Sequence, residues 1–149
     1  MKYLVAVDGS ESSMAAVRYA VEQASATGAE VVAISVVVPD QFFTGGDDPP
    51  ESYTEAEDEL VTEDIGDAED EAQEALDEAA EIGDKEGIAV ETGLLYGEPV
   101  EAITEFADDN DFDAIFVGHR GLSDEYEGLV GSTAKDVVGR ATVPVTVVR

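Results

Sequence analysis

Residues 30–38 form a nearly continuous run of β-branched and apolar side chains that ends at Pro39. Such a run is typical of a strand in a parallel sheet that helices cover on both faces, because neither face of the strand is polar. Further strand candidates are residues 2–7, 88–96, 111–117 and 143–148, and segments with apolar residues at helical spacing lie between them. This alternation predicts one α/β domain over residues 1–149, with an open, five-stranded, Rossmann-like parallel sheet and helices on both faces.

Capping residues mark the first predicted helix. Ser10 or Ser12 can accept a hydrogen bond from the free N–H groups of a helix that runs to about Ala26. Gly28 is placed to end this helix in a left-handed conformation.

Residues 40–64 are predicted to form an acidic surface loop, since they combine glycine and proline pairs with many acids. This loop passes into a second helix that begins between Ser52 and Ile65 and ends near residues 83–87. The inward stripe of this helix is mostly alanine, which predicts close packing on the sheet. Pro99 suits the first turn of a third helix.

The chain carries 36 acidic residues against 7 lysines and arginines, a formal net charge of -29. Non-specific binding to nucleic acid or anionic lipid needs clustered cations, so neither a nucleic acid nor a membrane is expected as a partner. Residues 40–84 hold 19 acids and no lysine or arginine, whereas residues 118–149 hold four acids and four such bases. An anion can therefore approach the last stretch at the lowest electrostatic cost.

The scarcity of lysine beside so many acids resembles the surface of proteins from salt-loving organisms. At about 1 M salt the Debye length falls to roughly 3 Å, which screens the self-repulsion of such a surface. The chain has no cysteine, which excludes disulfides, thiolate metal sites and cysteine nucleophiles. No apolar run approaches the roughly 20 residues that span a bilayer, and Asp8 ends the first run too early for a secretory signal. The sequence predicts a cytoplasmic protein.

Two loops are expected to meet where ligands bind in open α/β sheets, beyond the carboxyl ends of the strands at the point where the strand order reverses. The first strand ends in Asp8-Gly9-Ser10, and the fourth ends in Gly118-His119-Arg120-Gly121. After nine intervening residues, Gly131-Ser132-Thr133 opens the last helix, predicted over residues 132–139. Glycines let backbone amides approach a phosphate, and a helix N-terminus adds N–H groups and a favourable dipole. The pattern Gly-x2-Gly-x9-Gly-Ser therefore predicts a phosphate site, although it is neither a Walker loop nor a Gly-x-Gly-x2-Gly motif.

These motifs resemble the universal stress protein family over nearly the whole chain. The resemblance rests on four segments besides the glycine pattern: residues 5–10 (Val-Ala-Val-Asp-Gly-Ser), 97–99 (Gly-Glu-Pro), 113–118 (Asp-Ala-Ile-Phe-Val-Gly) and 141–145 (Ala-Thr-Val-Pro-Val). The intact glycine pattern is similar to that of the ATP-binding members, whose fold is adenine nucleotide alpha hydrolase-like. The resemblance implies a stress-response regulatory or sensor protein that binds ATP, or alternatively AMP or ADP, with Mg²⁺ as a possible bridge between the phosphates.

The same resemblance implies roles for individual residues. Asp8 would lie near the ribose or adenine, and Val36 would flank the adenine. The residues implied to hold ribose and phosphates are Gly118, Gly121, Gly131, Ser132 and Thr133. The last strand, residues 143–148, is implied to pair antiparallel with its copy in a homodimer, which would also cover an exposed apolar edge.

Several alternatives remain open on the residues alone. Asp8 can equally serve as a turn or cap residue, and Arg120 can either contact phosphate or balance nearby acids. His119 is the only histidine, so no histidine-pair metal site is expected, and no convincing general base lies beside the glycine loop. ATP hydrolysis would thus be at most weak or partner-dependent, and whether the protein is an enzyme stays open.

Other functions make different demands on the sequence. A dimeric interaction module of the same fold that binds no nucleotide is the main alternative. A receiver-like phosphoacceptor domain would need an aspartate at the end of the third strand, where residues 92–97 contain none. Adenylation or pyrophosphatase chemistry would want a Ser-Gly-Gly-x-Asp loop after the first strand, and residues 8–12 do not match it.

Overall fold

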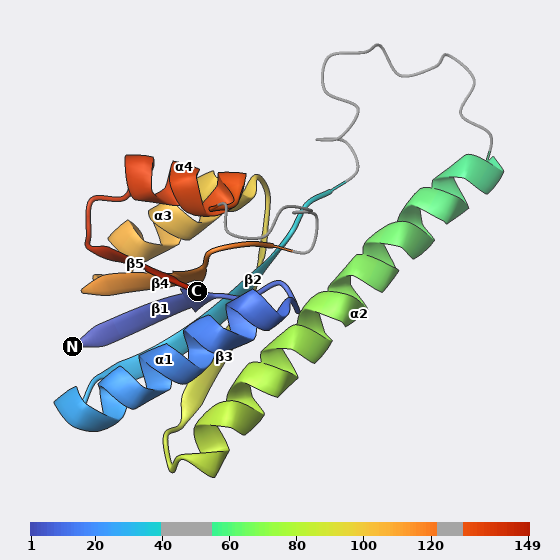
Figure 1. The fold of residues 1–149 in the computed structure, drawn as a ribbon. Helices are drawn as coiled ribbons and strands as arrows, with labels where there is room; N and C mark the ends of the chain where they lie inside the picture. Colours follow the sequence, from blue (N-terminus) through green and yellow to red (C-terminus); the bar gives the residue numbers. More distant parts are fainter. Residues whose placement is uncertain (40–54, 122–129) are drawn as a thin grey trace.

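The computed structural model describes residues 1–39, 55–121 and 130–149, and for residues 55–64 it describes the backbone alone. Five strands and four helices alternate along the described chain (Figure 1). They are β1 (Lys2–Ala6), α1 (Glu11–Thr27), β2 (Glu30–Val37), α2 (Glu55–Lys85), β3 (Val90–Tyr96), α3 (Pro99–Asp109), β4 (Ala114–Gly118), α4 (Ser132–Arg140) and β5 (Val145–Val148).

The sheet is parallel throughout and has the strand order β3-β2-β1-β4-β5. The chain builds outward from β1 to β3 and then returns to the other side of β1 with β4, so the order reverses between β1 and β4. Tyr3 pairs with Ala114 and Val5 with Phe116 across this junction. The predicted α/β fold with a five-stranded parallel sheet is confirmed.

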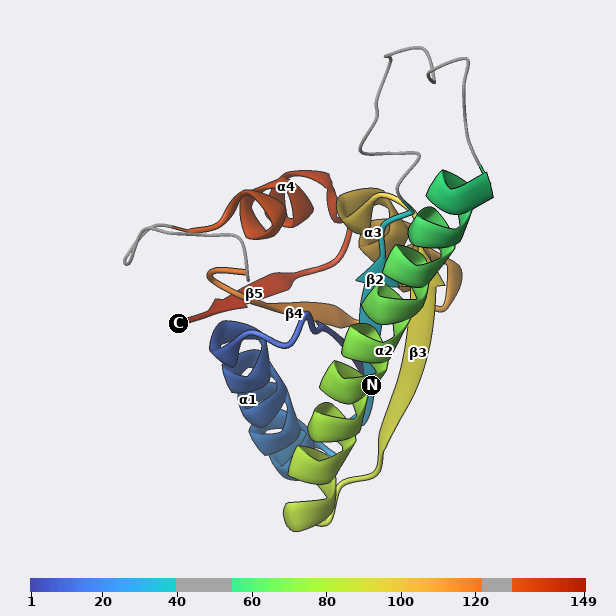
Figure 2. The ribbon, with the colours of Figure 1, turned by 90° about the vertical axis from the view of Figure 1, so that its right-hand side faces the viewer.

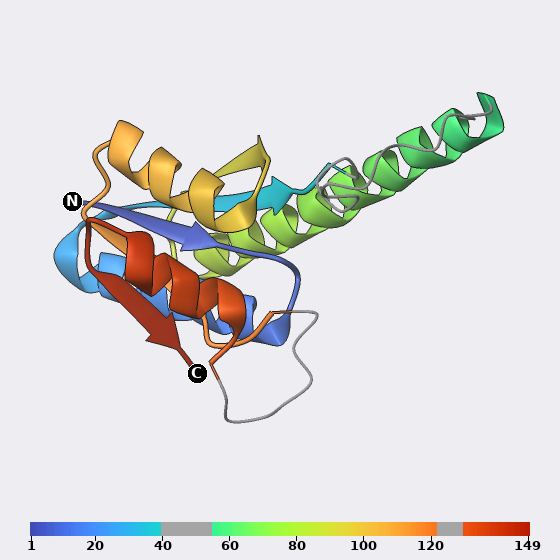
Figure 3. The ribbon, with the colours of Figure 1, turned by 90° about the horizontal axis from the view of Figure 1, so that it is seen from above.

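Helices cover both faces of the sheet, two on each (Figures 2 and 3). Side chains of α1 and α2 pack on one face with Tyr3 and Val5, whereas those of α3 and α4 pack on the other face with Leu4. Neighbouring residues of β1 thus contribute to different cores, because successive side chains of a strand point to opposite faces. The sheet separates two hydrophobic cores.

The predicted caps of the first helix are confirmed. The Ser10 hydroxyl accepts a hydrogen bond from the N–H of Ser13 at 3.1 Å, and Gly28 ends α1 with φ 77°. α3 begins at Pro99, as predicted, and the preceding Glu98 caps it through both carboxylate oxygens. One oxygen accepts from the N–H of Val100 at 3.1 Å and the other from the N–H of Glu101 at 2.8 Å.

The boundary between the acidic loop and α2 needs a correction. The helix begins at Glu55, within the expected range, so residues 55–64 are helical rather than part of a loop that reaches residue 64. Residues 40–54 lie outside the described part of the chain. The glutamate, alanine and leucine residues within 55–64 favour helix, and acidic side chains near a helix N-terminus are stabilised by the helix dipole. The density of charge that suggested a loop is therefore compatible with a solvated first part of α2.

The alanine stripe of α2 packs on the sheet as predicted. Ala75 and Ala79 are buried together with Leu76, and all three belong to the core beneath α1 and α2. Across the described residues, no helix combines the length and apolar character needed to cross a bilayer.

The last strand, β5, lies at the edge of the sheet next to β4, and its four residues are half-buried.

Candidate functional site

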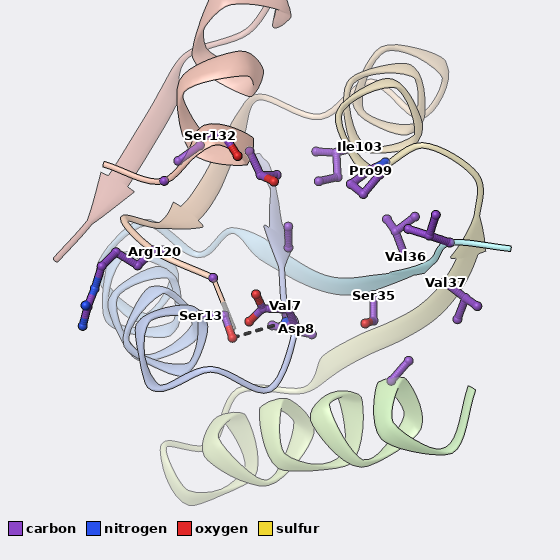
Figure 4. Close-up of a pocket in the computed structure, with 18 of the residues that line it drawn as sticks. Val7, Asp8, Ser13, Ser35, Val36, Val37, Pro99, Ile103, Arg120 and Ser132 are labelled. Carbon is purple, nitrogen blue, oxygen red and sulfur yellow. Dashed lines mark hydrogen bonds between the residues drawn. The ribbon is translucent and has the colours of Figure 1, made fainter. Parts of the chain in front are cut away.

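A cavity of about 480 Å³ lies at the carboxyl edge of the sheet, where β1 and β4 diverge (Figure 4). Its volume is within the range of roughly 300–1,000 Å³ that is usual for small-molecule pockets. The structure brings all eight site residues predicted from the sequence to the lining of this cavity: Asp8, Val36, Gly118, Arg120, Gly121, Gly131, Ser132 and Thr133. Their roles toward a ligand stay predictions.

The amino terminus of α4 forms one wall of the cavity. Gly131 is the N-cap residue and has no side chain that could accept from the first N–H groups of the helix. The helix itself begins with Ser132 and Thr133, whose side chains are exposed. Such N–H groups have no acceptor within the helix, and the helix dipole adds positive potential there. The N–H of Gly131 donates to the carbonyl of His119 at 2.5 Å, which holds the start of α4 against the end of β4. This wall is suited to an anionic group such as phosphate.

A second wall is apolar. Val36 of β2 lies beside Pro99 and Ile103 of α3, as Figure 4 shows. Ile103 is buried in the core beneath α3 and α4, and Val36 packs against that core. The cavity therefore combines an apolar wall, which a planar base can contact, with a wall of backbone donors.

Asp8 connects the turn after β1 with the cavity. Its carboxylate Oδ1 accepts hydrogen bonds from the N–H of Ser10 at 2.9 Å and from the Ser10 hydroxyl at 2.5 Å. Its own N–H donates to the Ser13 hydroxyl at 3.3 Å (Figure 4). Asp8 is thus a turn-forming residue of the kind expected after a strand. Because Asp8 also lines the cavity, the turn role and a ligand role are compatible.

Gly118 is required for packing, whatever it does toward a ligand. A Cβ atom at this position would lie 2.6 Å from the carbonyl carbon of Ser12 and 2.8 Å from the nitrogen of Ser13. These are backbone atoms of the first turn of α1, so any side chain at position 118 would separate β4 from α1. The glycine therefore permits the close approach of two elements that both border the cavity.

The side chain of Arg120 points away from the other labelled residues of the cavity (Figure 4). Its backbone N–H donates to the Ser12 hydroxyl at 3.3 Å, and the same hydroxyl lies 2.7 Å from Nδ1 of His119. The Nε atom of Arg120 is buried and has no hydrogen-bond partner within the described part of the chain. Backbone atoms thus place Arg120 at the cavity, while its guanidinium extends elsewhere.

Sequence reasoning missed several residues of the lining. Ser13 and Ser35 are both buried and both border the cavity, and Glu71 of α2 adds a carboxylate to its wall. Ser35 is the one polar side chain between apolar neighbours in residues 31–38, and that interruption is the signal that could have identified it. Glu71 lies among so many acids of α2 that no sequence signal distinguishes it.

The remaining electrostatic features lie outside the cavity lining. Desolvation raises the pKa of Tyr96 above its ordinary value, and a hydrogen bond to Glu69 and the negative charge of that residue raise it further. A tyrosine hydroxyl is protonated at neutral pH, so the phenol can donate to Glu69 and link the end of β3 to α2. Among the described side chains of residues 1–39, 65–121 and 130–149, no group of three or more histidine, cysteine, aspartate or glutamate residues is arranged to hold a metal ion.

Comparison with known proteins gives a consistent result. The whole chain, residues 1–149, matches the model of the Universal stress protein family. It is 34% identical over 148 residues to universal stress protein MJ0531 of Methanocaldococcus jannaschii, covering 99% of this chain and 81% of that protein.

Solved structures share the fold as well. UspA from Lactobacillus plantarum superposes with a TM-score of 0.83 at 26% identity, covering 100% of this chain and 97% of that chain. A universal stress protein from Archaeoglobus fulgidus, solved in complex with dAMP, gives a TM-score of 0.69 at 29% identity, with 100% and 98% covered. Other solved proteins of this fold are described in complex with cAMP and with AMP.

Proposed function

Because the chain belongs to the universal stress protein family, we propose that it binds an adenine nucleotide in the cavity beyond the carboxyl ends of β1, β2 and β4. One observation carries the proposal: the apolar wall at Val36 and the donor wall at Gly131 line the same cavity. A nucleotide has one apolar planar end and one anionic end, so its two parts match the two walls. Relatives in complex with dAMP and cAMP support adenine as the base.

ATP is the proposed ligand, with AMP and ADP as the alternatives. Ser132 and Thr133 would hold the phosphates together with the first N–H groups of α4, and Gly121 and Gly131 would let backbone approach them. Val36 would contact the adenine, and Asp8 would accept a hydrogen bond from the ribose or the base. Mg²⁺, when bound, would neutralise part of the phosphate charge, which matters because Glu71 also borders the cavity.

The proposed role is regulatory. Oδ1 of Asp8 accepts from Ser10, and Nδ1 of His119 lies 2.7 Å from the Ser12 hydroxyl, so both side chains are tied to the amino end of α1, and we assign neither of them the role of general base. Hydrolysis of ATP would accordingly be weak or would need a partner. The nucleotide then serves as a signal whose binding changes the surface around the cavity, as a cytoplasmic stress sensor requires.

The proposed assembly is a homodimer through β5. Val145–Val148 is an edge strand of three valines and one threonine, all half-buried, and such an edge is protected when a second copy adds its own strand. The net charge of -29 supports function at high salt concentration, where the repulsion between two such copies is screened.

Calorimetric titration with ATP, ADP and AMP tests the nucleotide site, with MgCl₂ present and in about 1 M KCl, where the Debye length is roughly 3 Å. Gly131→Val places a branched side chain at the amino end of α4, where the phosphates would approach the backbone. Binding should weaken at least about tenfold, which corresponds to about 1.4 kcal/mol. Gly139→Val is the matched control, because it lies at the other end of α4 and a Cβ there meets nothing within 4 Å. Circular dichroism checks that both variants are folded.

Two outcomes would contradict the nucleotide proposal. The first is tight ATP binding that survives Gly131→Val and the companion variant Gly121→Val. The second is a protein that dimerises, carries no nucleotide after purification in molar salt and binds none on titration. That second result would favour the alternative, a dimeric interaction module of the same fold.

A further inference from the structure

A second cavity of about 480 Å³ gathers an unusual share of the positive charge of this protein. Three arginines line it, Arg18 of α1, Arg120 after β4 and Arg149 after β5. The whole chain has only 7 lysines and arginines, and its net charge is -29. Two carboxylates, Glu11 and Glu78, also border the cavity, so its lining carries a net positive charge.

This cavity is distinct from the proposed nucleotide cavity. The two share only His119 and Arg120 among their lining residues. Those residues belong to the segment after β4, which forms a wall between them. The guanidinium of Arg120 extends away from the nucleotide cavity in Figure 4. Its charge is therefore available to the second cavity rather than to the first.

The three arginines form no close ion pair with any carboxylate that the structure describes. Among the side chains of residues 1–39, 65–121 and 130–149, the one ion pair within 4.0 Å joins Lys85 to Glu81. Among the side chains that the structure describes, no carboxylate lies within 4.0 Å of Arg18, Arg120 or Arg149, so their guanidinium groups can receive an external anion. The buried Nε of Arg120, which has no hydrogen-bond partner among the described residues, is a donor that such an anion can satisfy.

The amino-terminal turn of α1 contributes to the same cavity. Gly9, Glu11 and Ser12 border it, and the positive end of the α1 dipole lies there. The planar guanidinium group forms paired hydrogen bonds with the oxygens of a phosphate, which makes arginine well suited to phosphate recognition. We propose that this cavity binds a phosphate dianion, either inorganic phosphate or the phosphate group of a small monoester.

The experiment is a titration by ³¹P NMR at constant ionic strength, with inorganic phosphate in one arm and methyl phosphate in the other, and with no nucleotide present. The variants are Arg18→Gln and Arg149→Gln, since Arg120 also borders the nucleotide cavity. Arg140→Gln is the matched control, because it removes the same charge from the last turn of α4, outside the cavity. Arg18 lies on α1 rather than on the edge strand, so its variant keeps the result independent of dimer formation.

We expect the wild type to bind phosphate and each of the two variants to bind it at least about tenfold more weakly, the effect of losing one charge-assisted hydrogen-bonded pair. Arg140→Gln should bind phosphate as the wild type does, and ATP affinity should be unchanged in Arg18→Gln. Binding in both arms shows that the site accepts the phosphate group of a monoester, whereas binding in the first arm alone identifies free phosphate as the ligand.

Four results would overturn the second site. They are no phosphate binding by the wild type, equal binding by the arginine variants, an equal loss in Arg140→Gln, or loss of phosphate binding in Gly131→Val. The last would place the phosphate in the nucleotide cavity. Conversely, loss of ATP binding in Gly131→Val with phosphate binding retained separates the two sites, and failure of one proposal leaves the other testable.

Discussion

Gly118→Ala is the substitution whose effect the structure specifies most directly. The added methyl group would lie 2.6 Å from the carbonyl carbon of Ser12, 2.7 Å from its oxygen and 2.8 Å from the nitrogen of Ser13. All three atoms are backbone atoms, so the clash cannot be relieved by turning a side chain. The end of β4 must move away from the first turn of α1, and overpacking of this kind costs about 1–3 kcal/mol.

Thermal unfolding followed by circular dichroism measures this cost. In a domain of this size each kcal/mol lowers Tm by about 2–4 °C, so the midpoint should fall by roughly 2–12 °C. Gly139→Ala is the control, because a Cβ there meets nothing within 4 Å and the residue lies in α4. That control should be neutral or stabilising by about 0.5–1 kcal/mol. A Gly118→Ala protein that melts at the wild-type temperature would refute the packing argument.

Two further predictions concern a helix cap and the surface charge. Glu98→Ala removes the carboxylate that accepts from the N–H groups of Val100 and Glu101, and it should lower the free energy of unfolding by about 1–2 kcal/mol in urea denaturation. Glu101→Ala, which removes the same charge one turn later, should cost less, and equal losses would show that charge rather than capping matters. Raising KCl from about 0.1 M to 1 M shortens the Debye length from roughly 10 Å to 3 Å, so Tm should rise. An unchanged Tm, or an equal rise in sorbitol of matched osmolarity, would count against self-repulsion as the limiting term.

The fold was predictable because its signals are local and agree with one another. The β-branched run at 30–38, the Ser10 and Gly28 caps, and Pro99 each indicate one element, and their alternation implies the parallel sheet. The start of α2 was less predictable, since acids suit both a solvated loop and the first turns of a helix. Only the continuation of the backbone from Glu55 distinguishes the two.

The residues that border the cavity were predictable as a set, and their arrangement less so, while their roles toward a ligand stay predictions. Strand ends and glycine spacing locate the cavity, because the carboxyl ends of parallel strands meet at one edge. The direction of the Arg120 side chain depends on packing between segments far apart in the chain, and no local pattern encodes it. For the same reason, the spacing motif alone could not show that Gly118 serves the contact with α1.

The parallel sheet with β5 at its edge has a geometric consequence for any assembly through that strand. All five carboxyl strand ends lie on one side of the sheet, together with the cavity. If a second copy pairs its β5 antiparallel to this one, its strands run in the opposite direction. Its carboxyl strand ends, and the cavity beyond them, then lie at the opposite edge of the continuous sheet. The two mouths then face away from each other, and a single compact binding protein could contact only one of them at a time.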